Sequence, residues 1–188
     1  MTINKLLEPF HPNSINYQPF RDLDVRTLPA FKGPDDALRG QITEFYVTDN
    51  LRRAGAIPYT DIPRTLDSGL ELKMTDKGPG LFNLEGRPLS EYDGLFSYNG
   101  TKIATQVKAR GLKGIRKQLQ REVDQDYLRQ IFQGYDPSVL VFSPGRSRDF
   151  ELDLSDLKRD FPFMTFVKMF YSPRDLDRKV EEFKRRGD

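Results

Sequence analysis

The sequence predicts a single α/β domain in which helices flank a central mixed β-sheet. Two observations favour this class. Helical patterns with end signals cover about residues 34–54 and 113–133. Between and after them lie short strand-like runs, and two of these runs are separated by Asn99-Gly100, a dipeptide typical of a two-residue hairpin turn. Helices and strands in this order fit a sheet covered by helices.

The element boundaries follow from local signals. Asp35 or Asp36 can cap the first helix, Gly55 can end it, Gly134 can close the second, and Pro173 suits the first turn of the last. The expected elements are an irregular arm over 1–35, a helix over 34–54, a strand over 70–74, a hairpin over 90–109, a helix over 113–133, a strand over 138–142, a helix over 152–159, a strand over 164–171 and a helix over 173–186.

Composition narrows the class of protein. The 188 residues suggest one domain over 36–188, preceded by the 1–35 arm, which either packs on the domain surface or contacts DNA or a second copy of the chain. Cysteine is absent and His11 is the single histidine, which argues against disulfides, thiolate zinc sites and serine triads. No apolar run spans a membrane and no secretion signal is visible, so we expect an intracellular, cytoplasmic protein.

The hairpin register follows by counting outward from the turn. Side chains alternate across a strand, so one face of the hairpin collects four polar groups, and directly opposed Cβ atoms lie roughly 4.5–5.5 Å apart. The predicted pairs are Ser97 with Lys102, Leu95 with Ala104, Asp93 with Gln106, and Glu91 with Lys108. The polar face is Glu91, Asp93, Gln106 and Lys108, and the core face is Tyr92, Phe96, Ile103 and Val107.

Two carboxylates, an amide oxygen and a lysine on one face suggest a Mg²⁺ site that cuts phosphodiesters. Carboxylate, amide and main-chain carbonyl oxygens suit a hard cation, so Gln106 and the carbonyl of Val107 are candidate ligands beside Asp93. Lys108 can stabilise charge that develops on the phosphate. Glu91 is either a further ligand or the ion-pair partner of Lys108. The alternative is that Asp93 caps a turn and Lys108 is a solvated edge lysine.

These residues resemble the signature of the PD-(D/E)xK nuclease superfamily. Asp93 matches its first acid and Lys108 its lysine, Gln106 stands where a second acid is usual, and Glu91 matches a Glu-x-Asp variant. The resemblance spans roughly residues 39–142. It implies a restriction-endonuclease-like core of order αβββαβ, hydrolysis of DNA with Mg²⁺ or Mn²⁺, and, by analogy, a homodimer.

The resemblance also implies a further acid on the first helix, and two residues qualify. The family pattern favours Glu44, whereas the helical wheel places Asp49 within the apolar face. Both stay open on the sequence alone, and a solvated Glu44 is the alternative to a catalytic one.

A basic segment follows the proposed site and is a candidate for binding phosphates. Its cations, with no acid among them, are Lys108, Arg110, Lys113, Arg116, Lys117 and Arg121. Within it, Lys113, Lys117 and Arg121 repeat every four residues, as on one helix face. The alternative is an ordinary solvated helix face.

The sequence therefore predicts a Mg²⁺-dependent nuclease that acts on DNA. One rival hypothesis is an inactive or weak module of the same fold that binds nucleic acid or a partner protein, which Gln106 supports. The other is an unrelated α/β protein in which the hairpin polar groups form a surface network.

Overall fold

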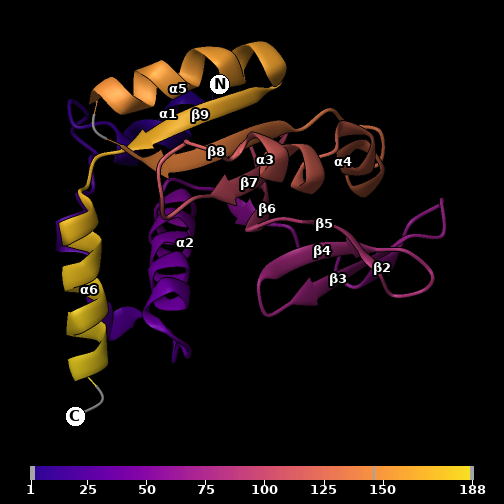
Figure 1. The fold of residues 1–188 in the computed structure, drawn as a ribbon. Coiled ribbons are helices and arrows are strands. Elements are labelled where there is room, and N and C mark those ends of the chain that lie inside the picture. Colours follow the sequence, from indigo (N-terminus) through magenta and orange to yellow (C-terminus); the bar gives the residue numbers. More distant parts are fainter. Residues whose placement is uncertain (1–2, 146, 187–188) are drawn as a thin grey trace.

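The main feature of the structure, a computed structural model, is a five-stranded mixed sheet (Figure 1). Residues 3–145 and 147–186 are described, with the backbone alone for 147–153. In spatial order the strands are β1 (Ile57–Pro58), β6 (Gly94–Tyr98), β7 (Thr101–Val107), β8 (Ser138–Pro144) and β9 (Met164–Met169). The pairs β1–β6 and β6–β7 are antiparallel, and β7–β8 and β8–β9 are parallel. The predicted mixed sheet flanked by helices is confirmed.

A second, antiparallel sheet of four strands was not predicted apart from one strand. Its strands, in spatial order, are β2 (Arg64–Thr65), β3 (Glu71–Thr75), β4 (Gly78–Phe82) and β5 (Pro88–Glu91). Only β3 matches the expected strand over 70–74. The other strands escape sequence reasoning because they are short or rich in glycine and proline, which are depleted in strands. In Figure 1 this sheet extends away from the main one at the lower right.

Two of the predicted helices are confirmed in position. The first is α2 (Asp35–Arg53), which ends as expected at Gly55, where φ is 101°. Its predicted cap is wrong, because Pro34 occupies the N-cap position and no side chain caps the helix. The last is α6 (Pro173–Arg185), which begins with a capping box between Ser172 and Asp175.

Two other helices differ from prediction. The expected helix over 113–133 is two helices, α3 (Arg116–Glu122) and α4 (Gln125–Ile131). The break occurs because Val123 is extended and the Asp124 carboxylate accepts hydrogen bonds from the first amides of α4, so a new N-cap replaces a continuous helix. The helix α5 (Ser147–Asp160) is longer than the expected 152–159.

The main sheet buries a different apolar layer on each face. Alternation along β7 sends Ile103 and Val107 to one layer and Ala104 to the other. The first layer contains α2, α6 and the N-terminal arm, and the second contains residues of α3, α4, α5 and the second sheet. The arm includes the short helices α1 (Asn4–Leu7), η1 (Glu8–Phe10), η2 (Phe20–Asp22) and η3 (Val25–Thr27). Its Phe10 and Phe20 are fully buried, so the arm is part of the first layer.

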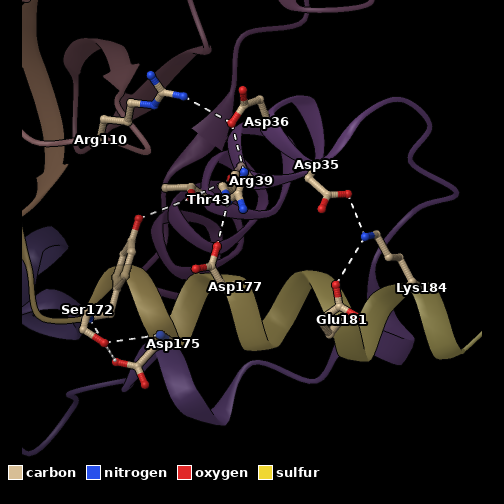
Figure 2. Close-up of polar contacts among 11 residues, drawn as sticks. Asp35, Asp36, Arg39, Thr43, Arg110, Ser172, Asp175, Asp177, Glu181 and Lys184 are labelled. Atoms are coloured by element: carbon tan, nitrogen blue, oxygen red, sulfur yellow. Dashed lines mark hydrogen bonds and ion pairs between the residues drawn. The ribbon is translucent and has the colours of Figure 1, made fainter.

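Ion pairs and one buried hydroxyl pair fix α2 against α6 (Figure 2). Arg39 contacts Asp177 at 2.8 Å, and Asp35 contacts Lys184 at 2.7 Å. These pairs are exposed, so solvent screens them and each adds little to stability. The buried contact of the Thr43 hydroxyl with that of Tyr171, at 3.2 Å, lies one residue from Glu44 and helps to orient this part of α2.

No helix in the described part of the chain is long and apolar enough to cross a membrane.

Candidate active site

Asp93 lies at a bend between β5 and β6, at the end of the predicted hairpin. The register predicted from the Asn99-Gly100 turn is confirmed, since Leu95 pairs with Ala104 and Ser97 with Lys102. The pairing reaches Asp93, whose amide donates to the Thr105 carbonyl at 3.1 Å. Its carboxylate Oδ2 accepts a 2.5 Å hydrogen bond from the amide of Val107. The carboxylate is thereby fixed at the end of β7.

Gln106 lies beside Asp93 and its amide is held on both sides. The side chain is 2% exposed, Nε2 donates to the Glu91 carbonyl at 2.6 Å, and Oε1 accepts from the Lys108 ammonium at 3.2 Å. A carbonyl and an ammonium group demand opposite ends of the amide, so the orientation of Gln106 is determined. A glutamate here could not donate to Glu91 while ionised, which gives a physical reason for glutamine at this position.

The predicted pairing of Glu91 with Lys108 is wrong. Glu91 is the last residue of β5 and pairs with Gly80 in the second sheet, and its observed contact with the site is through its main-chain carbonyl. The chain changes sheet at Tyr92 and Asp93, so counting along one hairpin fails beyond Asp93. Alternation had also placed Gln106 and Lys108 on one face, and their side chains do meet.

Glu122, the last residue of α3, is the carboxylate that contacts Lys108. Lys108 Nζ lies 3.0 Å from Glu122 Oε2, and the two side chains are only 11% and 15% exposed. The other carboxylate oxygen accepts from Gln118 Nε2 at 2.8 Å. Glu122 directly follows the basic segment in the sequence and was not among the predicted site residues. No local spacing reveals it, because the loop after β7 and the early end of α3 bring it back to the strand.

Glu44 is the acid that α2 brings to the site. Burial raises the pKa of its carboxyl, and the positive charge of Lys108 opposes that rise, which places Glu44 within electrostatic reach of the lysine. The other candidate, Asp49, instead forms a 2.8 Å ion pair with Arg53 on the same helix. Of the two acids left open by the sequence, the structure brings Glu44 to the site.

Burial and two neighbouring carboxylates together raise the pKa of Asp93. Burial raises the pKa of Asp93 to about 8, and the negative charges of Glu44 and Glu122 add to this effect. The hydrogen bond from Val107 and the charge of Lys108 lower the Asp93 pKa, but they offset only part of the increase. Three acids and one lysine thus share a poorly solvated space in which a further positive charge is favoured. We call Glu44, Asp93, Gln106, Lys108 and Glu122 the carboxylate–lysine cluster.

The donor chemistry of this cluster fits Mg²⁺ or Mn²⁺ held with few protein ligands. Among the side chains that the structure describes, in residues 3–145 and 154–186, no three His, Cys, Asp or Glu form a ready-made metal-binding group. Mg²⁺ usually binds one or two carboxylates and keeps several waters, so such a group is not required. Asp93 and Glu44 are suitable carboxylates, because burial raises the pKa of both and a nearby cation would favour their ionised forms.

The basic segment is only partly arranged as predicted. Ile115, Leu119 and Val123 are buried in the second apolar layer. Lys113 precedes α3 and is not on a helix, so the predicted four-residue stripe is wrong at its first member. Lys117 on α3 is exposed.

The remaining cations of the segment differ in how free they are to bind phosphate. Arg121 is exposed, with a long 3.6 Å contact to Glu122. Arg116 is bound to Asp160 at 2.6 Å, and Arg110, which Figure 2 shows next to Asp36, contacts it at 3.2 Å.

Comparison with protein families, with curated proteins and with solved structures finds no match to this chain. The resemblance to the PD-(D/E)xK superfamily stays a prediction based on the residues of the site.

Proposed function

We propose that the protein is a metal-dependent nuclease of the PD-(D/E)xK type that hydrolyses phosphodiester bonds in DNA. The observation that carries this proposal is the 3.0 Å ion pair of Lys108 with Glu122 at the end of β7, together with the electrostatic interaction of Lys108 with Glu44 and Asp93. These residues come from a helix, a bend and a second helix, so a surface network along a single hairpin does not account for them.

The cation ligands in this proposal are Asp93 and Glu44. The main-chain hydrogen bond from Val107 fixes the Asp93 carboxylate before a cation arrives, and Glu44 is half-buried on α2. A bound Mg²⁺ or Mn²⁺ would polarise the scissile phosphate and lower the pKa of an attached water. Gln106 has its oxygen on Lys108, and its part is to hold the lysine.

Lys108 is the residue that would face the reacting phosphate. Its ammonium is held by Gln106 and Glu122, which restricts its position without removing its charge. A fixed positive charge beside the phosphate stabilises the negative charge that develops as water attacks. Glu122 holds the ammonium from α3, and its other carboxylate oxygen accepts from Gln118.

A cleavage assay tests the proposal. Labelled single-stranded, duplex and branched DNA, and RNA, are incubated with Mg²⁺ or Mn²⁺ or with EDTA. The proposal expects metal-dependent cutting that Asp93→Asn, Glu44→Gln and Lys108→Ala abolish. The matched control is Asp49→Asn, an acid on α2 outside the cluster, which should keep full activity.

Two outcomes would reject the proposal. Cutting that survives Asp93→Asn would place the chemistry elsewhere. Wild-type protein that binds DNA but cuts no substrate would favour the inactive module, for which the engagement of Lys108 by Glu122 and Gln106 is the supporting observation.

A further inference from the structure

A pocket of about 580 Å³ lies between the second sheet and the end of α4, among residues that the cluster does not use. Its volume is within the range of small-molecule sites. The polar side chains that line it are Arg64, Thr65, Asp67 and Ser68 from β2 and the following turn, and Arg129, Gln130 and Gln133 from the last part of α4 and just beyond it.

The two arginines of the pocket are already neutralised. Arg64 contacts Asp61 at 2.8 Å, and Arg129 contacts Asp126 at 3.3 Å and Asp136 at 2.5 Å. A phosphate or other compact anion therefore gains little charge attraction here. The pocket instead suits a neutral ligand that offers both donors and acceptors.

Arg64 provides a fixed planar surface in this lining. Its side chain is 17% exposed, it lies over the ring of Tyr59, and its guanidinium also donates to the carbonyl of Ile131. Its buried Nε has no hydrogen-bond partner in the described part of the chain. Planar guanidinium groups stack on nucleobases, and glutamine amides pair with base edges.

We propose that this pocket binds a nucleoside, with the base against Arg64 and its polar edge and sugar on the amides and hydroxyls of the lining. Gln130 and Gln133 each present one donor group and one acceptor, and Thr65 and Ser68 add hydroxyls that can do either. This mixture matches the alternating donors and acceptors of a base edge and the hydroxyls of a sugar.

The pocket is linked to the carboxylate–lysine cluster along the chain by α4, and the meaning of this link rests on the proposed function. Glu122 ends α3, and α4 begins three residues later and runs for 7 residues toward the pocket. At 1.5 Å per residue, α4 spans about 10 Å. On the proposed function, the pocket would hold a base of the same strand that the carboxylate–lysine cluster cuts.

The experiment is an NMR titration of the full chain with adenosine, guanosine, cytidine and thymidine, and separately with inorganic phosphate. Thr65→Val keeps the β-branched shape and removes the hydroxyl, and Gln133→Gly removes the amide where φ is 56°, a conformation that glycine accepts. Gln120→Ala, at an exposed position on α3, is the matched control.

Saturable binding of at least one nucleoside, with a Kd of about 1 mM or tighter, is expected. Each pocket variant should weaken it about fivefold and Gln120→Ala should not. Binding unchanged in both pocket variants, absence of nucleoside binding, or phosphate that displaces the nucleoside would overturn the proposal. Asp93→Asn should bind nucleosides like wild type, so loss of cleavage and loss of this site are distinguished.

Discussion

Replacing Asp93 with asparagine should stabilise the cation-free protein at neutral pH while it removes activity. The ionised carboxylate is disfavoured in the fold because it is buried close to the charges of Glu44 and Glu122. An asparagine has nearly the same shape, and its amide oxygen can still accept the hydrogen bond from the Val107 amide. The substitution therefore removes an unfavourable charge and keeps the contact.

The magnitude follows from the raised pKa. Between the ordinary value of 3.8 and about 8, folded Asp93 holds a proton that the unfolded chain releases. The contribution of protonated Asp93 to the stability of the fold is fully present below pH 3.8, and it is lost as the pH rises toward about 8. The limiting slope for one proton is about 1.4 kcal/mol per pH unit. From pH 5 to 7, wild type should lose on the order of 2–3 kcal/mol that Asp93→Asn does not lose.

Urea unfolding at pH 5, 6 and 7 in EDTA measures this difference. The free energy of unfolding of wild type should fall relative to that of Asp93→Asn as pH rises. Asp49→Asn, which alters an acid paired with Arg53, should follow wild type. Parallel pH dependences for wild type and Asp93→Asn would refute the argument that burial and repulsion hold a proton on Asp93.

Three further substitutions test other parts of the site. Glu122→Gln should slow cleavage by roughly 10²-fold, measured under single turnover, and a rate equal to wild type would exclude Glu122 from the site. Gln106→Glu should lower the free energy of unfolding by about 1–3 kcal/mol without raising activity, because a main-chain carbonyl loses its donor, and faster cleavage would contradict this. Gly94→Ala places a Cβ 2.5 Å from the Phe96 ring and should lower the free energy of unfolding in urea by about 1–3 kcal/mol. The control Gly111→Ala, whose new Cβ has its nearest contact at 3.8 Å, should be near neutral. Equal effects of the two substitutions would be inconsistent with the packing around Gly94.

The part of the site that lies within one hairpin could be predicted from the sequence. The Asn99-Gly100 turn determines the register of β6 and β7, and the register places Asp93 opposite the end of β7. Local turn geometry is sufficient for this, since a two-residue loop leaves one pairing. Counting fails at Glu91 because the chain leaves the main sheet there and joins a second one.

The site residues that tertiary packing brings to the cluster could not be predicted from the sequence in the same way. Glu122 reaches Lys108 because α3 ends at Glu122, and the N-cap formed by Asp124 competes with a continuous helix that the apolar spacing favoured. On α2, the family pattern favoured Glu44, whereas the helical wheel gave Asp49 a claim. The packing of α2 against the sheet and α6 selects between them.

Calorimetric titration with Mn²⁺ or Mg²⁺ at pH 7, in two buffers of different ionisation enthalpy, tests most directly whether the carboxylate–lysine cluster is a cation site. Because Asp93 holds a proton at this pH, binding of the cation should release about one proton, and this release should disappear in Asp93→Asn and remain in Asp49→Asn. Failure of wild type to bind either cation, or equal binding and proton release by Asp93→Asn, would contradict a metal site at Asp93.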